Sequence, residues 1–386
     1  GLGSDGAMEI MPQPTRILVI RLSAIGDIVF ASPLIAALRR AYPQAHLAWL
    51  AQPECEPLLR HHPDLDQVIL WPRGEWQALW RERRWRELGR RVRALRAELR
   101  RQRFDLALDL QGLLKSGLLA WLSGAQERVG LGSREGSQWL MTRVVPRGGD
   151  PRAIGSEYRF LAERLGLFGL PGLSGLPGPP GLPREGFPMA LAPGAEDRAF
   201  TRDLIARQGW GSGYVVICPF TTRPQKHWFE ERWADLAARL HRDLGLPVLM
   251  LGGPADRGAA VGIAQRTATA GPGLTDLAGG TSLLQAAALI EASRLVIGVD
   301  TGLSHMGIAF GRPTLLLFGS TRPYLDTGRA NARVLYHPLP CSPCKRRPTC
   351  GGAFDCMRRI EVDEVLGAAS DLLRPERQEE GGGHES

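Results

Sequence analysis

The stretch ILVIRLSAIGDIVFASPLIAALRR, Ile17 to Arg40, decides the fold. It begins with a mostly apolar run of strand length, and apolar residues at helical spacing follow Gly26. A strand that passes through a tight turn into a helix opens a doubly wound α/β sheet. Asp27 stands at this junction, where the alternatives are a reactive carboxylate and the N-cap of a helix over residues 28–40.

The same alternation of strand and helix patterns continues along both halves of the chain. The predicted strands are 17–22, 46–51, 68–71 and 106–110 in the first half, and 214–219, 248–251, 295–299 and 314–318 in the second. Helical patterns such as 232–244 and 283–292 lie between them. This order predicts two Rossmann-like domains with parallel sheets, which we expect to face each other across a central cleft. Ligands of such sheets bind beyond the carboxyl ends of the strands.

Length and composition predict how the chain is divided. A chain of 386 residues is long for one core, so two domains are expected. Glycine recurs at every third position through six triplets after Leu165, too few for a stable collagen helix, which favours a semi-rigid linker. The predicted parts are a disordered tail (1–15), an N-terminal domain (16–165), the linker (166–190), a C-terminal domain (191–340), a four-cysteine segment with a C-terminal helix (341–374) and a disordered tail (375–386).

The overall composition is typical of a globular protein with an anionic partner. The chain is 44% hydrophobic but has no apolar run of membrane-spanning length. Its first residues lack the basic and apolar regions of a signal peptide, so a cytoplasmic location is expected. The formal net charge of +8 predicts an anionic partner without identifying it.

Much of the positive charge falls in residues 81–103, which hold eleven arginines and three glutamates. Leu88, Val92, Leu95 and Leu99 share one helical face within this segment. One interpretation is a solvated surface helix. The other is a basic amphipathic surface that meets phosphates or an anionic membrane leaflet.

The motif IGVDTGLSHM combines a strand end with phosphate-binding chemistry. The strand ends at Asp300 and a helix begins near Gly302, so the N–H groups of Thr301, Gly302 and Leu303 would lie at the positive end of a helix. The alternative is an ordinary capped helix in which His305 packs in the core.

Two further segments place polar side chains at strand ends. TTRPQKHW offers Thr221, Thr222, Arg223 and Lys226, a set of hydroxyls and cations that suits a diphosphate. LMLGGPADR offers Asp256, either a ligand of ribose hydroxyls or an N-cap. The chain lacks GxxxxGK[ST] and lacks GxGxxG after its first strand, which argues against a P-loop NTPase and weakens a dinucleotide dehydrogenase. The second half therefore predicts a nucleotide-diphosphate site.

Four motifs in this order, SAIGDIVFASPLIAAL, DLQGLLKSG, TTRPQKHW and DTGLSH, resemble the ADP-heptose:lipopolysaccharide heptosyltransferases of glycosyltransferase family 9. The resemblance runs from Arg16 to Gly328 and is strongest to the branch that adds the first heptose to Kdo. It implies a GT-B fold, an ADP-L-glycero-D-manno-heptose donor and an inverting transfer that requires no catalytic metal or other cofactor. It also implies Kdo-lipid A or inner-core lipopolysaccharide as acceptor, and a peripheral location at the inner face of the inner membrane.

The resemblance further implies roles for individual residues. Asp27 falls on the general base, which takes the proton of the acceptor hydroxyl while the diphosphate leaves from the opposite side of the sugar. The expected donor-binding set is Thr221, Thr222, Lys226, Asp256, Thr281, Asp300, Thr301, Gly302, Leu303 and His305. The expected acceptor-binding set is Ser23, Gly26, Gln111, Lys115, Arg81 and Arg84.

The segment CSPCKRRPTCGGAFDC sets Cys341, Cys344, Cys350 and Cys356 at a spacing that suits a structural tetrahedral metal site. Reduced thiols or a disulfide pair are the alternatives. Similar four-cysteine fingers occur in autotransporter heptosyltransferases, where the resemblance implies iron, and zinc is equally consistent with four sulfurs. A protein O-heptosyltransferase therefore stays an alternative, as does a non-catalytic nucleotide- or RNA-binding protein.

Overall fold

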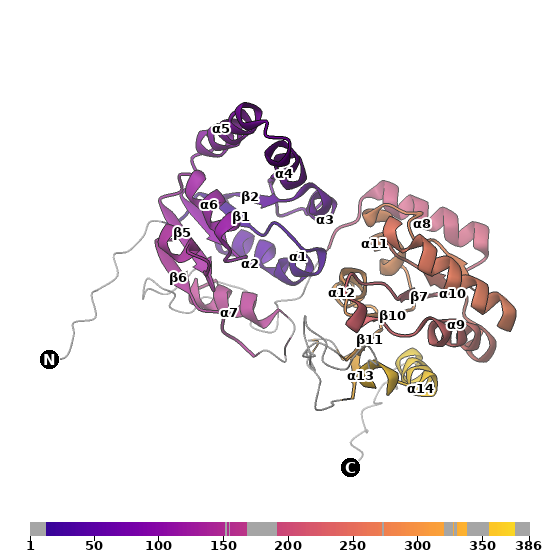
Figure 1. The fold of residues 1–386 in the computed structure, drawn as a ribbon. Helices are drawn as coiled ribbons and strands as arrows, with labels where there is room; N and C mark the ends of the chain where they lie inside the picture. Colours follow the sequence, from indigo (N-terminus) through magenta and orange to yellow (C-terminus); the bar gives the residue numbers. More distant parts are fainter. Residues whose placement is uncertain are drawn as a thin grey trace, which may run out of the picture. The chain divides into compact units, whose positions relative to one another are not determined.

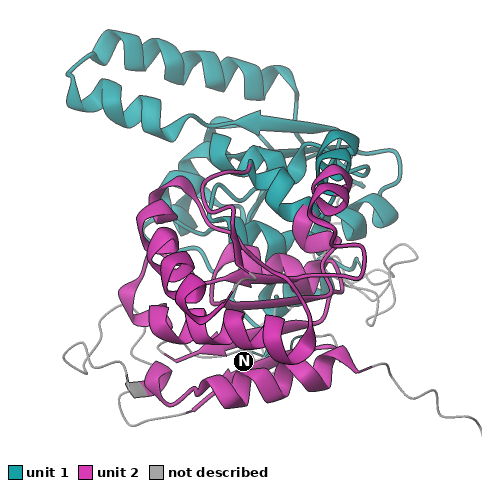
Figure 2. Ribbon diagram, turned by 90° about the vertical axis from the view of Figure 1, so that its right-hand side faces the viewer, with its two compact units in different colours: residues 1–201, 282–288, 324–328 teal, residues 202–281, 289–323, 329–386 magenta. Residues whose placement is uncertain are grey.

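The computed structural model describes residues 13–150, 153, 155–167, 191–271, 274–319, 327, 330–337 and 355–374. The chain divides into two compact units (Figure 2). Unit 1 comprises residues 1–201, 282–288 and 324–328, and unit 2 comprises residues 202–281, 289–323 and 329–386. Within the described ranges, no helix combines the length and the apolar character that a membrane span needs.

Each unit is built on one six-stranded parallel sheet. Unit 1 contains β1 (Arg16–Ile20), β2 (His46–Ala51), β3 (Gln67–Leu70), β4 (Leu106–Asp109), β5 (Glu127–Leu131) and β6 (Arg143–Val145). Unit 2 contains β7 (Val215–Cys218), β8 (Val248–Met250), β9 (Leu274–Asp276), β10 (Leu295–Val299), β11 (Thr314–Phe318) and β12 (Ala332–Tyr336). The strand orders are β3-β2-β1-β4-β5-β6 and β12-β11-β10-β7-β8-β9. Counted from its own first strand, each sheet therefore runs 3-2-1-4-5-6, the Rossmann order.

Helices connect successive strands in both units (Figure 1). Unit 1 has α1 (Ile25–Ala31), α2 (Pro33–Ala41), η1 (Pro53–Cys55), α3 (Glu56–Leu59), α4 (Arg73–Arg81), α5 (Trp85–Arg101), α6 (Leu114–Leu122), η2 (Ser137–Leu140) and α7 (Ser156–Arg164). Unit 2 has η3 (Pro224–Lys226), α9 (Glu230–Leu244), η4 (Pro254–Asp256), α10 (Arg257–Ala270), α12 (Gly302–Ala309), α13 (Asp355–Arg358) and α14 (Val362–Leu373). Residues of α8 (Ala195–Gln208) and α11 (Leu283–Glu291) are divided between the units.

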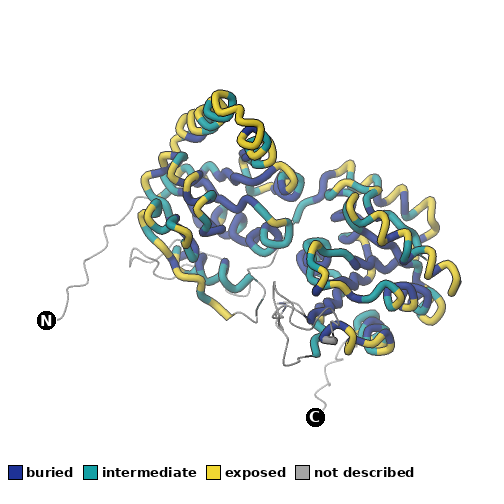
Figure 3. The backbone as a smooth tube through the Cα atoms, viewed as in Figure 1, coloured by how far each residue is buried: buried dark blue, intermediate teal, exposed yellow. Residues whose placement is uncertain are grey.

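The central strands are buried except at the first residues of β1 and β4, and Figure 3 shows buried segments inside both units. Leu18 and Ile20 of β1 pack in one cluster with Leu99 of α5 and Leu119 of α6. Because side chains alternate along a strand, Ile17 and Val19 point to the opposite face of the same sheet. The strands therefore need apolar residues on both faces, which explains their continuous apolar runs.

The core of unit 2 includes the C-terminal helix. Trp228 and Trp233 meet edge to face with ring centroids 4.9 Å apart, and both are buried. The indole N–H of Trp228 donates a hydrogen bond to the carbonyl of Ile360 at 3.0 Å. Val365 of α14 packs in the same cluster. The segment after the four cysteines is therefore an integral part of unit 2.

The predicted α/β class is confirmed, and all eight predicted strands are present. Sequence patterns missed β5, β6, β9 and β12. β6, β9 and β12 are edge or near-edge strands with few fully buried residues, so their apolar pattern is weak. β5 is interrupted by Gly130, which weakens a strand pattern.

The single helix predicted over 28–40 is wrong in its bounds. Two helices stand there, because Pro33 starts a second helix at its first position and cannot continue the hydrogen-bond ladder of the first. The first helix begins at Ile25, so Gly26 lies inside its first turn rather than in a separate tight turn.

Several predicted features fall outside the described residues. These are the collagen-like part of the linker from 168 onward, residues 1–12 of the predicted N-terminal tail, the C-terminal tail (375–386), and Cys341, Cys344 and Cys350. Cys356 is described and lies buried on α13.

Candidate functional site

In each unit, most of the predicted site residues follow the two central strands. These strands are β1 and β4 in unit 1, and β7 and β10 in unit 2. Asp27, Gln111 and Lys115 come after β1 and β4, whereas Lys226 and Asp300 come after β7 and β10. Neighbouring strands whose connections run in opposite directions leave a crevice at their carboxyl ends, where doubly wound sheets bind ligands.

Asp27 is held in place by an ion pair at the start of α1. Its Oδ2 lies 2.7 Å from Arg21 Nη2 and accepts a hydrogen bond from the Ala24 N–H at 3.3 Å. The Arg21 side chain is 11% exposed and the Asp27 side chain 41%. Ala24 is the N-cap residue, so Asp27 supports the helix from its first turn and is not an N-cap. Ser23 and Gly26 lie beside it, both partly exposed.

Arg21 is a site residue that the sequence analysis missed. It is buried just beyond the carboxyl end of β1, and Trp49 Nε1 donates a hydrogen bond to its carbonyl at 3.0 Å. Tyr158 of α7 also lies within electrostatic reach of its guanidinium. The sequence did contain a signal for Arg21, since it is a cation inside the apolar run ILVIRL. A charged residue that is buried with such a strand needs a partner of opposite charge, which points to a nearby carboxylate.

Gln111 ties the ends of β1 and β4 together. Its Oε1 accepts a hydrogen bond from the Leu22 N–H at 2.9 Å. Asp109 Oδ1 accepts from the N–H groups of Gln111 and Gly112, both at 3.1 Å, although burial raises the pKa of Asp109. Gly112 has a left-handed φ of 68°, and a Cβ there would collide with the backbone after β5. The turn after β4 therefore needs glycine at position 112. The contact of Gln111 with Leu22 fixes the segment that leads from β1 into α1, where Asp27 lies.

Lys115 marks a cationic region at these strand ends. It lies in the first turn of α6, where burial and then the charges of Arg73 and Arg21 lower its pKa. Arg81 and Arg84 lie at the turn between α4 and α5 instead. The rise of α4 separates Arg81 from Arg73 by about 12 Å. The structure thus groups Lys115 with Arg21 and Arg73, and places the other two predicted acceptor ligands at the far end of α4.

In unit 2, Lys226, Asp300 and His305 form one connected network. Lys226 Nζ lies 2.7 Å from Asp300 Oδ2, and His305 Nε2 lies 2.9 Å from Asp300 Oδ1. Burial raises the pKa of Asp300, but its contacts with His305 and the Lys226 ammonium outweigh burial and hold it well below the ordinary value. Asp300 therefore stays ionised and orients the ammonium and the imidazole. His305 is 2% exposed, as the core-histidine alternative predicts, and its hydrogen bond to Asp300 also connects it to this network.

The N-terminus of α12 lies beside this network. Thr301 is its N-cap and makes no side-chain cap, so the first backbone N–H groups, including those of Gly302 and Leu303, have no partner within the helix. A Cβ on Gly298 would collide with α12 and β7, and one on Gly307 would press on β10 and β11. These two glycines let α12 lie directly against the central strands. Its positive end is therefore held at the carboxyl end of β10.

The loop after β7 is shaped by a histidine that the sequence analysis did not single out. His227 Nε2 lies 2.7 Å from the carbonyl oxygen of Thr221, a hydrogen bond that closes the loop. Thr222 is exposed, Thr221 partly exposed, and Lys226 stands at the end of the short helix η3. The loop thus presents two hydroxyls and one ammonium beyond β7.

The two remaining donor candidates lie on neighbouring loops. Asp256 Oδ2 accepts a hydrogen bond from the Gly253 N–H at 2.8 Å, which closes the turn before α10. Its local structural role is therefore observed, and its side chain stays partly exposed. Thr281 is partly exposed and precedes α11.

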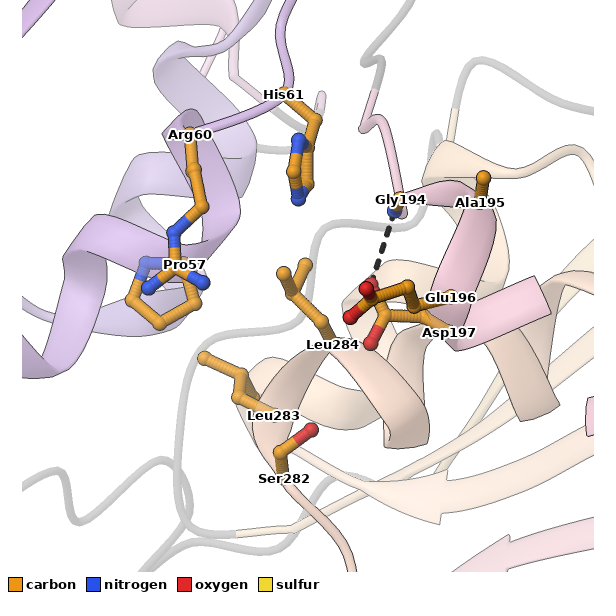
Figure 4. A pocket seen from close by; sticks show the side chains of 10 residues that line it. All are labelled: Pro57, Arg60, His61, Gly194, Ala195, Glu196, Asp197, Ser282, Leu283 and Leu284. Atoms are coloured by element: carbon orange, nitrogen blue, oxygen red, sulfur yellow. Dashed lines mark hydrogen bonds between the residues drawn. The ribbon is translucent and has the colours of Figure 1, made fainter. Parts of the chain in front are cut away.

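Unit 1 also contains a cavity of about 530 Å³. Figure 4 shows its lining side chains: Pro57, Arg60, His61, Gly194, Ala195, Glu196, Asp197, Ser282, Leu283 and Leu284. The Gly194 N–H donates to Asp197 Oδ2 at 3.0 Å, and Arg60 pairs with Glu56 at 2.6 Å. None of the predicted site residues lines this cavity.

In the described part of the chain, no group of three or more His, Cys, Asp or Glu side chains is placed to hold a metal ion. Three of the four tail cysteines fall outside that part. The tail metal site therefore remains a prediction from cysteine spacing.

The sequence profile of glycosyltransferase family 9 (heptosyltransferase) matches residues 92–352. This chain belongs to glycosyltransferase family 9. The protein is thus a glycosyltransferase, and its two doubly wound units form a GT-B fold. The predicted family and enzyme class are confirmed.

Curated relatives of this family 9 enzyme include lipopolysaccharide heptosyltransferases of two kinds. Lipopolysaccharide heptosyltransferase 1 of Pseudomonas aeruginosa is 29% identical over 347 residues, which cover 87% of each chain. Lipopolysaccharide heptosyltransferase 2 of Escherichia coli K12 is also 29% identical, over 80% of this chain and 84% of its own. Identity alone therefore does not separate the two kinds.

Solved structures agree with the fold. The ADP-heptose lps heptosyltransferase II of E. coli superposes with a TM-score of 0.68 at 26% identity, over 93% of this chain and 98% of its own. A glycosyltransferase of family 9 from Veillonella parvula superposes with a TM-score of 0.73 at 20% identity, over 93% and 97%. The second likeness concerns the fold alone.

Proposed function

We propose that this family 9 glycosyltransferase transfers L-glycero-D-manno-heptose from ADP-heptose to the Kdo/heptose inner core of lipopolysaccharide, with inversion at the anomeric carbon. The observation that carries the proposal is the placement of Lys226, Asp300 and the free end of α12 around neighbouring central strands of unit 2. A fixed ammonium beside a helix N-terminus suits a diphosphate leaving group. The names of the relatives supply the sugar and the acceptor class.

The donor is assigned to unit 2. Lys226 and the N–H groups of Thr301, Gly302 and Leu303 bind the diphosphate, where negative charge grows as the glycosidic bond breaks. Asp300 and His305 hold the lysine in its orientation. The remaining donor ligands in this proposal are Thr221 and Thr222 at the diphosphate, Asp256 at the ribose and Thr281 near the adenine.

Asp27 of unit 1 acts as the general base. The acceptor oxygen forms a bond to the anomeric carbon, the bond from that carbon to the diphosphate breaks, and the acceptor proton passes to the Asp27 carboxylate. Arg21 keeps that carboxylate oriented through its 2.7 Å ion pair. The partial exposure of Asp27 is consistent with access for an acceptor hydroxyl.

The acceptor is assigned to the segments beyond β1 and β4. Lys115 places its amino group in the first turn of α6, just after β4, where it suits Kdo carboxylates and lipid A phosphates. The proposed acceptor set is Ser23, Gly26, Gln111, Lys115, Arg81 and Arg84. A lipid-linked acceptor also favours a cytoplasmic enzyme that associates with the inner face of the inner membrane.

The four-cysteine segment is proposed to hold one structural zinc or iron ion. Four thiolates would complete a tetrahedral site and leave no open position for substrate, so no step of the transfer needs this ion. The relatives reported above are lipopolysaccharide enzymes, which favours a saccharide acceptor over an autotransporter serine or RNA.

Mass spectrometry of the products tests the proposal. Purified protein with ADP-heptose is offered Kdo-lipid A, the same acceptor already carrying one heptose, an autotransporter peptide, and no acceptor. A mass increase of one heptose on either saccharide acceptor supports the proposal and identifies the order of addition. Transfer to the peptide alone, or to none of them while ADP-heptose still binds, would contradict it.

A further inference from the structure

The whole net charge of the chain resides in one helical hairpin. Residues 73–103, which we call the arginine hairpin, comprise α4, a short turn and α5. They hold twelve arginines and four glutamates, a net charge of +8, whereas the remaining chain has 36 basic and 36 acidic residues. The partner that the overall charge predicts therefore belongs at this hairpin.

The arginine hairpin extends from unit 1 and has few buried side chains. Leu79 is the buried residue of α4 and Leu99 that of α5. Figure 2 shows the two helices projecting from the unit, and Figure 3 shows them largely exposed. A solvated helix pair of this kind has little packing reason for exposed aromatic side chains.

Two tryptophans nevertheless stand at the free end of the hairpin. Trp80 is 62% exposed and Trp85 49%. Their rings meet edge to face with centroids 4.6 Å apart. The chain reverses between them through Arg83, whose φ of 56° is left-handed. An exposed indole pair at the tip of a projecting element marks an interaction site.

Several arginines of α5 are free to bind phosphates. Arg90, Arg91 and Arg101 pair with glutamates of the hairpin. Arg86, Arg93 and Arg96, in contrast, have no carboxylate or carbonyl partner among the described residues. Arg86 and Arg93 lie on the side of α5 opposite Leu88, Val92, Leu95 and Leu99, and Arg96 borders that apolar face. All three are exposed, so their guanidinium groups are available to an anionic partner.

We propose that the arginine hairpin docks on an anionic phospholipid bilayer. Trp80 and Trp85 enter the interfacial region, where indole rings place an apolar body in the acyl boundary and an N–H among the headgroups. Arg86, Arg93 and Arg96 contact lipid phosphates, which arginine binds in bidentate fashion. The inference rests on the proposed function in one respect, because a lipid-linked acceptor requires an enzyme at the membrane surface.

RNA fits the hairpin less well. Proteins that bind single-stranded nucleic acid interleave aromatic platforms along the basic groove, so that successive bases can stack. Here the two exposed tryptophans stand together at one end, Trp76 packs on Trp71, and α5 has no aromatic residue beyond Trp85. Indoles gathered at a tip, with guanidinium groups behind them, match the layered order of acyl chain and headgroup phosphate.

Vesicle co-sedimentation without acceptor tests the proposal. The vesicles are phosphatidylcholine alone, or phosphatidylcholine with about one-third phosphatidylglycerol. The full-length wild type is compared with W80A/W85A and R86E/R93E/R96E. Matched controls are W139A, which removes an 84% exposed tryptophan elsewhere in unit 1, and R202E/R207E/R266E, which reverses exposed arginines outside the hairpin.

The wild type is expected to bind only the anionic vesicles, and less tightly as salt shortens the Debye length. Each hairpin variant should weaken the apparent Kd at least about tenfold, whereas both controls stay within about twofold. Tryptophan emission should shift to shorter wavelength on binding, and W80A/W85A should lose that shift. Equal binding to neutral vesicles, equal losses in the controls, or binding to an RNA oligonucleotide without binding to vesicles would overturn the proposal.

Turnover of a deacylated, water-soluble acceptor separates docking from catalysis. The hairpin variants should retain wild-type kcat and KM on that acceptor, because they leave the assigned donor and acceptor residues intact. Turnover without vesicle binding by the wild type would overturn docking and leave the proposed function standing. Vesicle binding without any heptose transfer would support docking and contradict the proposed function.

Discussion

At the scale of single residues, Asp27 has an observed structural task and a proposed chemical one. Its carboxylate stabilises the start of α1 through the Ala24 N–H and neutralises the buried Arg21 guanidinium. The two contacts fix its orientation, which a general base requires because the proton must pass along a short, aligned path. Structural support and catalysis are therefore compatible in one side chain.

Replacing Asp27 by asparagine separates these tasks. Asparagine can still accept the Ala24 N–H but cannot take a proton, so kcat should fall by about 10²–10⁴-fold. Arg21 loses its ionised partner, so the free energy of unfolding should fall by roughly 1 kcal/mol, since the pair is partly exposed. Steady-state kinetics, urea unfolding and ADP titration measure the three quantities, and ADP affinity should be unchanged.

Glu54 offers a matched control for the base. Burial raises the pKa of the Cys55 thiol to about 12, with smaller contributions from Glu54 and Asp27, so both carboxylates lie near this thiol. Glu54 is exposed and hydrogen-bonds Gln52. Glu54→Gln should retain near-wild-type turnover. If Glu54→Gln loses turnover and Asp27→Asn does not, the base is Glu54.

Asp300 should show a pH-dependent contribution to stability. Its folded-state pKa is depressed, so it stabilises the protein fully above the unfolded-state value near 4 and loses this contribution as the pH falls further. Asp300→Asn leaves Lys226 and His305 without their carboxylate and should cost roughly 3 kcal/mol at neutral pH. The difference from wild type should shrink below about pH 4, because there the unfolded wild-type chain takes up a proton at Asp300 while the folded protein still holds this carboxylate ionised.

Urea unfolding over a pH series measures this difference. The exposed Asp235 of α9 supplies the control, because Asp235→Asn should change stability by less than about 0.5 kcal/mol at every pH. A cost for Asp300→Asn that grows as the solution is acidified would contradict the stabilising role assigned to the network.

At the scale of elements, α12 shows how a short helix becomes a binding element. An isolated helix of eight residues is marginal in water, so tertiary packing must hold it. Six of its eight residues are buried, and Gly298 and Gly307 provide the close approach to the central strands. The DTGLSH motif predicted a helix start at this place, and the structure confirms it.

A second prediction at the scale of elements concerns the metal content of the four-cysteine segment. Purified protein should contain about one equivalent of zinc or iron, because four thiolates suit one tetrahedral ion. Cys344→Ser should lose the metal and lower the melting temperature, since a structural ion contributes its binding free energy to folding. Elemental analysis with thermal melting tests this, and Cys55→Ser is a control cysteine outside the segment. Metal-free wild-type protein would refute the metal site.

At the scale of the whole molecule, the two units should respond differently to the donor nucleotide. ADP at about 100 times its Kd stabilises the unit that binds it by roughly 2.7 kcal/mol. Amide hydrogen exchange should therefore slow in unit 2, most at residues 301–305 and 221–226, and change little across β1 and α1. Lys226→Met should abolish the protection. Equal protection of both units would show that donor contacts are not confined to unit 2.

Much of the architecture follows from local sequence patterns. Continuous apolar runs are required where a strand is buried on both faces, so seven of the eight predicted strands could be recognised from these runs. The eighth, β3, is a partly exposed edge strand whose short apolar run was still recognisable. Motifs at strand ends could be recognised for the same reason, because a strand that stops at glycine or a polar residue places the next side chains at the sheet edge. Edge strands such as β9 escaped detection since one side of them is solvated.

The pairing of distant side chains was decided only by the tertiary structure. Lys226 and Asp300 are 74 residues apart, and Leu22 and Gln111 are 89 apart. They meet because β7 lies beside β10 and β1 beside β4, and strand order depends on how whole helices pack across both faces of a sheet. The pattern of apolar residues along the sequence indicates whether a residue is buried, but it does not indicate which strand lies beside it. The sequence by itself therefore determined eight of the twelve described strands, the family and most of the candidate residues, whereas the Arg21–Asp27 and Lys226–Asp300–His305 contacts required the folded chain.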